Sequence, residues 1–319
     1  STFNTLYGGG GTVGQALRPF PQYQTINTDC CLENLGQSTY NALLAKVERR
    51  FHNGLNLLAS YTFSKTLTDA DSALPIFASF SSGIQNSFNL KQEKSYSIQD
   101  IPHTFVVSYI YELPFGKGKK LLSHGGTLDK VVGGWQIGGV QRYQAGQPTI
   151  FGCQGGLVSG YDGCIRYDYV PGQSFLSPNA GSFDNASAIL NGGTGCIPDP
   201  NRPGFFIPSS SNSYFNCAAF FDQNFAPKNG QSGPFLFGNM PRITAAVRSH
   251  AYHNEDFSLI KRTPIFESHM LILKVELPNA FNRHTFSRPD TGITDNAFGA
   301  TGGSINPQRT LQLSLRYEF

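Results

Sequence analysis

The residues of this sequence best suited to chemistry are its six cysteines. They are Cys30, Cys31, Cys153, Cys164, Cys196 and Cys217. An even number of cysteines in Gly-, Ser- and Asn-rich surroundings predicts disulfides made in an oxidising compartment. A zinc site is disfavoured, because the chain has no Cys-x-x-Cys pair and no histidine at ligand spacing nearby. We favour the bridges Cys153–Cys164 and Cys196–Cys217, with Cys30 and Cys31 either forming a strained vicinal bridge or staying free. The sequence leaves this connectivity open.

No other group of residues predicts catalysis or a cofactor. The seven histidines lie in separate segments, and only His250 and His253 are close. On a strand these two would face opposite sides, so a shared metal is not expected. The acidic stretch 69–71 lacks a third acid at calcium-loop spacing, and the glycine run 8–11 lacks the Lys-Ser/Thr of a phosphate loop. We therefore expect a non-enzymatic protein without catalytic residues, metal or cofactor.

Composition narrows the class of protein further. Of 319 residues 14% are charged, and the net charge is +3. That charge is too small for a nucleic-acid surface, so no nucleic-acid partner is expected. No apolar run approaches the roughly 18 residues of a membrane-spanning helix, so insertion into a membrane would need a β-barrel. The chain starts at Ser1 without a signal peptide, which suggests a mature product or a fragment.

The elements that would position any site are strands, and the clearest is the last. Residues 310–319 alternate strictly between apolar and polar side chains, which predicts a strand with two different faces. Its apolar face carries Leu311, Leu313, Leu315, Tyr317 and Phe319. A terminal strand that ends on an aromatic residue is typical of outer-membrane barrels, whose strands face lipid outward and a polar lumen inward. We expect this strand to be the one that the barrel-assembly machinery recognises.

Six further segments repeat the alternation, at 40–50, 55–66, 103–113, 134–147, 252–263 and 269–279. Asn53-Gly54 is a hairpin signal between the first two. The polar positions predicted to face a lumen include Lys46, Glu48, Ser60, Thr62, Glu112, Lys274, Glu276 and Arg316. This polarity favours a barrel over a soluble β-sandwich. Aromatic residues near predicted strand ends would form girdles: Tyr61, Phe63, Tyr109, Tyr111, Phe115, Trp135, Tyr317 and Phe319.

The connections between these segments alternate in length. Those at 51–54 and 264–268 are tight and 114–133 is intermediate, whereas 67–100, 148–245 and 282–306 are long. Short periplasmic turns and long extracellular loops are the asymmetry of an outer-membrane barrel. Counting back from a periplasmic C-terminus places residues 1–39 and every cysteine at the extracellular end. We expect loop 148–245 to be too polar and Gly/Ser-rich to order itself by burial, so that disulfides must hold it.

Several stretches together resemble a known family. They include YNALLAKVERRF at 40–51, ASYTFSK at 59–65, HTFVVSY at 103–109, ELPFGKGK at 112–119, GGWQ at 133–136, QAGQP at 144–148 and ELPNAFN at 276–282. This order of motifs resembles the late barrel of TonB-dependent-receptor-like outer-membrane proteins, in particular the acidobacterial type with a carboxypeptidase-regulatory-like domain. The resemblance covers most of 20–319 outside the long Cys-bearing loop. It implies a plugged barrel of about 22 strands, of which residues 40–319 would be the seven-stranded C-terminal portion.

Seven strands leave an edge to be closed. An upstream part of the polypeptide, an eighth strand at 20–28 within the extracellular segment 1–39, or a neighbouring copy could close it. The leading hypothesis is a barrel in outer-membrane lipid that binds or imports a bulky nutrient, a glycan or peptide, through its extracellular loops. The alternative is a processed C-terminal fragment that assembles with other copies of itself into an extracellular β-rich filament or tubule. A soluble binding module is the least favoured reading.

Overall fold

The computed structural model describes residues 20, 36–70, 85–86, 89–122, 126–154, 165–178, 195–209, 214–225, 236–266 and 268–319. In these ranges the chain is almost entirely strand and loop, with one short α-helix, α3 (Thr127–Val132), and the 3-10 turns η3 (Leu90–Glu93) and η5 (Cys217–Ala219). None of these helices is long and apolar enough to cross a bilayer. The all-β prediction is confirmed. Most of segment 1–39, including nearly all of the possible extra strand at 20–28, lies outside the described residues.

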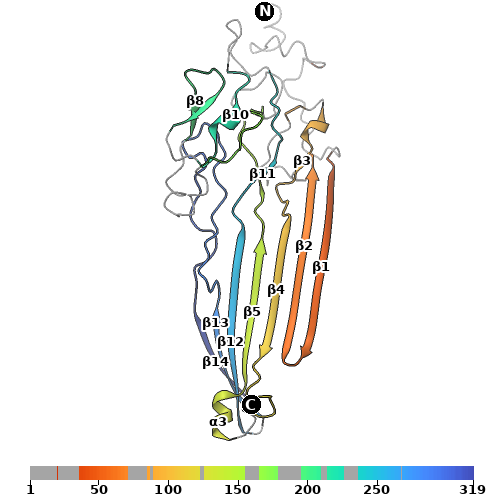
Figure 1. Ribbon diagram of the computed structural model, residues 1–319, viewed down its shortest axis with the longest axis vertical. Helices are drawn as coiled ribbons and strands as arrows, with labels where there is room; N and C mark the ends of the chain where they lie inside the picture. Colours follow the sequence, from red (N-terminus) through yellow and green to blue (C-terminus); the bar gives the residue numbers. More distant parts are fainter. Residues whose placement is uncertain are drawn as a thin grey trace, which may run out of the picture.

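Seven long strands form one antiparallel sheet whose members follow one another in chain order (Figure 1). They are β1 (Ser38–His52), β2 (Leu55–Thr68), β4 (His103–Glu112), β5 (Trp135–Gln144), β12 (Tyr252–Phe266), β13 (His269–Leu277) and β14 (Gln312–Glu318). Each corresponds to one of the seven predicted segments. The short β3 (Ser95–Tyr96) pairs with the end of β2. Among the described residues the sheet is open, because β1 and β14 each pair on one side only.

The connections lie at the two ends of the sheet as the alternation of lengths predicts. Figure 1 shows α3 and the C-terminus at one end, and the short strands of the long loops at the other. Asn53 (φ 53°) and Gly54 (φ 80°) form the tight β1–β2 turn at the α3 end, where two positive φ values match the twist of a hairpin. The helix in the β4–β5 connection was not predicted. With the C-terminus in the periplasm, the end with the long loops is extracellular.

The strand register defines the two faces of the sheet, because residues paired across strands share a face. One row on the outer face runs through Arg49, Leu57, Tyr109, Gly139, Phe257 and Leu277. The neighbouring row on the inner face runs through Asn56, Ile110, Gly138, Ser258, Glu276 and Gln312. The outer face is therefore predominantly apolar, and the inner face is mixed. The inner face is less polar than predicted, since Leu58, Ile110 and Val140 stand on it with exposed side chains.

Aromatic residues form two belts on the outer face. Toward the extracellular end, Tyr61 Oη lies 2.8 Å from His103 Nδ1, and the rings of Phe105 and Tyr143 stack at 6.3 Å. At the periplasmic end the belt comprises Phe266, His269, Tyr317 and Phe319. Aliphatic residues such as Leu271, Leu273, Val275, Leu313 and Leu315 lie on the same face in between. This is the pattern of a surface that crosses a lipid bilayer.

Tyr109 differs from the predicted girdle because it lies in the middle of β4. It pairs directly with Gly139 on β5. A Cβ on Gly139 would lie 2.8 Å from Tyr109 Oη and 2.9 Å from Cζ. The tyrosine side chain therefore lies over the glycine and fills the outer face that Gly139 leaves bare.

The hydrophobic core lies in the extracellular loops, not in the sheet. Segments of 148–245 and 282–306 form a folded unit, which we call the cap. It contains three two-stranded sheets, made by β6 (Pro148–Thr149) with β11 (Thr244–Arg248), β7 (Asp168–Tyr169) with β10 (Phe220–Phe221), and β8 (Cys196–Pro198) with β9 (Phe206–Pro208). Its centre is a cluster of buried rings from Phe151, Phe175, Phe215, Phe220 and Phe298.

The expectation that loop 148–245 cannot order itself by burial is therefore wrong. Its phenylalanines are spread along a loop rich in Gly, Ser and Asn, so they form no local apolar pattern and meet only in the folded structure. Phe298 of the next long loop completes the cluster. The Cys196–Cys217 disulfide predicted from the sequence is present, with both cysteines in the same core. The disulfide thus adds to a core that burial already organises.

Truncating a buried side chain at the centre of the cap should unfold the cap and leave the barrel folded. Phe215 is fully buried, so Phe215→Ala should destabilise the cap by about 3–5 kcal/mol. Phe225→Ala, at a cap residue that is 41% exposed, is the matched control and should cost about 1 kcal/mol or less. Limited proteolysis of detergent-solubilised protein along a urea series measures both. Equal protease resistance of the two variants would contradict this assignment of the core.

Candidate functional site

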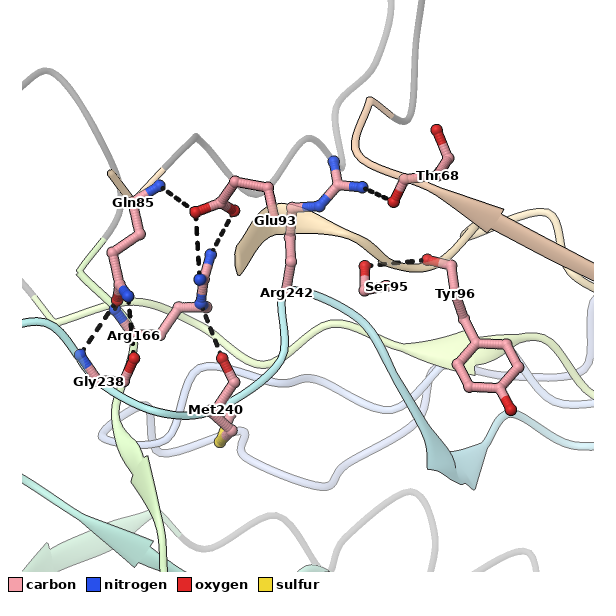
Figure 2. A network of polar contacts seen from close by, with 9 residues as sticks. All are labelled: Thr68, Gln85, Glu93, Ser95, Tyr96, Arg166, Gly238, Met240 and Arg242. Atoms are coloured by element: carbon pink, nitrogen blue, oxygen red, sulfur yellow. Dashed lines mark hydrogen bonds and ion pairs between the residues drawn. The ribbon is translucent and has the colours of Figure 1, made fainter. Parts of the chain in front are cut away.

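The cap is fastened to the barrel by a buried ion pair between two long loops (Figure 2). Arg166 Nη1 donates to Glu93 Oε2 at 2.7 Å and Nη2 donates to Oε1 at 3.2 Å. Both side chains are almost completely buried, at 4% and 0% exposure. Arg166 Nε also donates to the carbonyl of Met240 at 2.9 Å. Because Glu93 belongs to loop 67–100 and Arg166 to loop 148–245, the pair joins the two loops.

Gln85 completes this anchor, as Figure 2 shows. Its Oε1 accepts from the backbone N–H of Arg166 at 2.7 Å and of Gly238 at 3.2 Å. Its Nε2 donates to the Gly238 carbonyl at 2.9 Å, and its own N–H donates to Glu93 at 3.1 Å. Both the oxygen and the nitrogen of this buried amide are therefore hydrogen-bonded. Losing any one member of this network would leave a buried polar group unpaired and would lower the stability of the folded loops. The network therefore favours one arrangement of the loops.

A second anchor ties the cap to the top of the sheet. Arg248 Nη2 donates to Asp100 Oδ2 at 2.7 Å, and Nη1 donates to the Gly146 carbonyl at 3.1 Å. Asp100 also accepts from the backbone N–H of Thr66 on β2 at 2.6 Å. Arg242 Nη2 donates to the Thr68 carbonyl, at the end of the same strand, at 2.9 Å. The cap therefore stands in a fixed position over the extracellular end of the barrel.

Below the cap, the inner face of the sheet encloses a hollow of about 860 Å³. Residues from β1, β2, β4, β5, β12 and β13 line it, among them Lys46, Asn56, Ile110, Val140, Ser258 and Glu276. Strands near one edge of the sheet and strands near the other edge thus border the same hollow, so the inner face is concave. This hollow is the described part of the barrel lumen.

Lysines and glutamates of the lumen form ion pairs along their own strands. Lys46 Nζ lies 3.0 Å from Glu48 Oε2, and Lys274 Nζ lies 2.6 Å from Glu276 Oε1. Each pair is spaced two residues apart, which puts both partners on one face of a strand. The side chains are partly exposed, so these pairs contribute little to stability. Arg50 also pairs with Glu48, so β1 brings two cations to this one carboxylate.

The predicted site residues are distributed as follows. Cys153 is disulfide-bonded, but its predicted partner Cys164, like Cys30 and Cys31, lies outside the described residues. His250 lies in the cap between the rings of Tyr214 and Phe286, whereas His253 packs against Tyr143 on the outer face. Over the described ranges, no three His, Cys, Asp or Glu residues are grouped to hold a metal ion.

The C-terminal strand lies at an open edge of the sheet. Its apolar residues Leu311, Leu313, Leu315, Tyr317 and Phe319 are all exposed. Leu313, Leu315 and Tyr317 pair with Val275, Leu273 and Leu271 on the outer face. β14 hydrogen-bonds to β13 only, within the described residues. The strand therefore presents an apolar face and a row of backbone groups toward its surroundings.

An open up-and-down sheet with an apolar outer face, two aromatic belts and long loops at one end defines an outer-membrane type of β-barrel. Comparison with known families gives the same class. A family model described as an outer membrane beta barrel domain matches residues 2–312, and the chain belongs to this family, which places it in the bacterial outer membrane. The match includes the long Cys-bearing loop. No curated protein was found to match the chain.

The anchors and the core of the cap were not identified from the sequence. Glu93, Asp100, Arg166 and Arg248 are single charged residues in polar loops, and nothing in their spacing pairs them. A signal was nevertheless present at Arg166, because Ile165 and Tyr167 flank it in a long loop. A charged residue between apolar neighbours suggests burial, and a buried charge needs a partner.

The cap should be sensitive to alkali, above all through Tyr167, although burial also raises the pKa of Tyr214. Burial raises the pKa of Tyr167 to about 12 from its usual 10.0, with Asp222 and Asp295 acting in the same direction. Since the folded cap holds this proton more tightly than the unfolded chain, its stability should fall between pH 10 and 12. The loss amounts to about 3 kcal/mol for a two-unit shift.

Tyr167→Phe removes this titration, so the variant should keep more of its stability above pH 10 than the parent protein does. Urea unfolding of the cap at pH 8, 10 and 11.5 measures the difference. Tyr40→Phe, at an exposed position of β1, is the control and should follow the parent. Identical pH profiles for Tyr167→Phe and the parent would exclude Tyr167 as the source.

Proposed function

We propose that this protein is a non-enzymatic outer-membrane receptor of TonB-dependent type that binds a bulky nutrient through its extracellular loops and passes it to the barrel. The observation that carries the proposal is the cap. A loop unit with its own core, a disulfide and two ion-pair anchors is far more ordered than a barrel needs for insertion alone. Rigid scaffolds that present loops are the usual sites of binding.

The cap surface offers suitable contacts for a large ligand. Four large apolar side chains are exposed on it, namely Ile197, Phe225, Leu236 and Phe237. Ligand-binding surfaces of glycan and peptide receptors use such apolar and aromatic residues beside polar groups. A bulky ligand would meet these residues before it reached the lumen. This order of contact supports a glycan or peptide as the nutrient.

The same proposal implies two partners for the barrel, the lipid of the outer membrane and the barrel-assembly machinery. The apolar outer face and its belts would contact outer-membrane lipid. The exposed β14 edge would pair with the barrel-assembly machinery during insertion, because its backbone groups need hydrogen-bond partners in a membrane.

Uptake tests the proposal directly. Cells lacking the gene should fail to accumulate at least one member of a panel of fluorescently labelled oligosaccharides and oligopeptides, and the intact gene should restore accumulation. Collapsing the inner-membrane proton gradient should abolish accumulation but leave surface binding intact, because TonB-dependent transport draws on that gradient. A gene carrying Phe215→Ala should restore neither. Unchanged accumulation of every labelled compound in the deletion strain would refute uptake.

The open edges favour a second candidate function. Over the described residues β1 and β14 each have an unpaired side, and β1 also exposes Leu43, Leu44 and Val47. Copies of the chain could pair through these edges and extend the sheet into a filament or tubule. In this alternative the protein is a structural subunit outside the cell.

A proline in the edge strand distinguishes the two candidates. If the chain polymerises through β14, Leu313→Pro should remove a backbone donor at this edge and abolish polymer growth. Electron microscopy of protein in aqueous buffer measures this, with Leu313→Ala as the control that keeps the donor. Polymers that grow equally well from the proline variant would exclude β14 as the contact, and isolated particles in detergent only would favour the receptor.

A further inference from the structure

A second, smaller pocket lies where the lumen opens toward the cap. Its volume is about 280 Å³. One wall is the extracellular end of β5 and β12 on the inner face, and the other is the loop that follows β13. The residues that matter for its chemistry are Arg142, Gln147, Tyr252, Phe286, Arg288 and Ile305. We call it the rim pocket.

Arg142 gives the rim pocket one positive charge without a neighbouring acid. Its neighbours on the same face of β5 are Val140 and Gln144, and its cross-strand partners are Val106 and Asn254. Nη2 donates to Gln144 Oε1 at 2.7 Å, and the guanidinium lies 5.5 Å from the centre of the Tyr252 ring. These contacts orient the guanidinium but carry no negative charge.

Two lysines of the lumen below do have an acid on their own strand. On β1 and β13 a glutamate stands two residues from the lysine and pairs with it, as in Lys46–Glu48 and Lys274–Glu276. On β5 the position two residues after Arg142 is Gln144, an amide of nearly the same shape as glutamate. The side-chain geometry of the strand pair is kept, while its negative charge is missing.

Arg288 adds a second cation from the opposite wall. It donates to Gln147 Oε1, and burial lowers the pKa of its guanidinium. A partly desolvated cation attracts an anion more strongly than one in bulk water. No residue that lines the described pocket is Asp or Glu. Two guanidinium groups thus face one small space with no acid in its walls.

The walls are held by backbone hydrogen bonds. Ser249 N–H donates to the Gln147 carbonyl at 2.8 Å, and Gln147 N–H donates to Ser249 Oγ at 3.0 Å. On the other side, Ile305 N–H donates to the Thr285 carbonyl at 2.8 Å. Gly146 is required here, because a Cβ would lie 1.7 Å from the Ser249 carbonyl oxygen. The pocket is therefore preformed, which lowers the entropy cost of binding.

We propose that the rim pocket binds the carboxylate of the incoming ligand, presented either by an acidic sugar or by the end of a peptide. The planar fork of a guanidinium matches a carboxylate, and two forks can hold it from both sides. Tyr252, Phe286 and Ile305 supply an apolar wall for the rest of the bound unit. The volume is at the small end for ligand sites, so it fits one residue of a longer chain.

This inference rests on the proposed function and names the class of its ligand. The rim pocket lies between the cap and the hollow of the lumen, on the path from one to the other. A ligand captured by the cap would reach these arginines before the neutral charge pairs below. Selection for a carboxylate would therefore take place at the entrance.

Binding by the full chain in detergent at low salt tests the inference. Two acidic probes, trigalacturonate and N-acetylated trialanine, are compared with their neutral counterparts, galactotriose and N-acetylated trialanine amide, by isothermal titration calorimetry. At least one acidic probe should bind about tenfold or more tightly than its counterpart, and the winning pair identifies sugar or peptide as the source.

Two variants localise that preference. Arg142→Gln should abolish it, whereas Arg262→Gln should retain it. Arg262 is an exposed arginine that pairs with Ile272 on the inner face toward the periplasmic end, so its loss removes the same charge far from the pocket. Equal weakening by both variants, or no preference for either acidic probe, would overturn the rim pocket as a carboxylate site. If cells take up a labelled compound but the purified protein shows no preference for acidic probes, the rim pocket is refuted and the receptor function is retained. If the purified protein prefers acidic probes but cells take up none of the labelled compounds, the receptor function is refuted and the carboxylate site is retained.

Discussion

The register of the seven-stranded sheet is the constraint on which everything else in this structure depends. Side chains alternate with a period of two, so a slip of one residue between any two strands would turn a lipid-facing row toward the lumen. The row from Leu57 through Tyr109, Gly139 and Phe257 to Leu277 stays apolar across five strands. A single register therefore sets the lipid surface, both aromatic belts and the wall of the hollow. It also brings Arg142 of β5 beside Tyr252 of β12.

The cap solves a different problem, since no lipid organises it. Its rings from Phe151, Phe215 and Phe298 bury themselves against one another, as in a small soluble domain. Its attachment to the barrel is polar instead, through Glu93 with Arg166 and Asp100 with Arg248. Removing one partner of a fully buried pair leaves an uncompensated charge, which is far more costly than losing a surface pair. The anchors therefore fix the orientation of the cap more strictly than apolar contacts would.

The strands could be predicted from the sequence because their signal is local. Alternation in 40–50 or 269–279 is visible within ten residues, and the turn at Asn53-Gly54 marks a hairpin by its own chemistry. The cap could not be predicted, since its information is spread over distance. Phe151 and Phe298 share a core across much of the chain, and Arg166 meets Glu93 from another loop. The sequence left the disulfide connectivity open, and the structure confirms the favoured bridge between Cys196 and Cys217, which joins residues 21 apart.

The charges on the inner face of the sheet could not be interpreted from strand alternation alone. Alternation assigns each residue to the inner or the outer face, but it does not show which charged side chains on the inner face form ion pairs. Glu48 and Glu276 pair with Lys46 and Lys274 on the inner face, while Gln144 brings no negative charge to Arg142 at the extracellular end. Glutamine has nearly the same shape as glutamate but no charge, so the pair of Arg142 with Gln144 keeps one positive charge where a pair with glutamate would be neutral. In the proposed receptor, the arginines of the rim pocket would concentrate an anion at the mouth of the barrel, because a cluster of like charges raises the local concentration of its counter-ion.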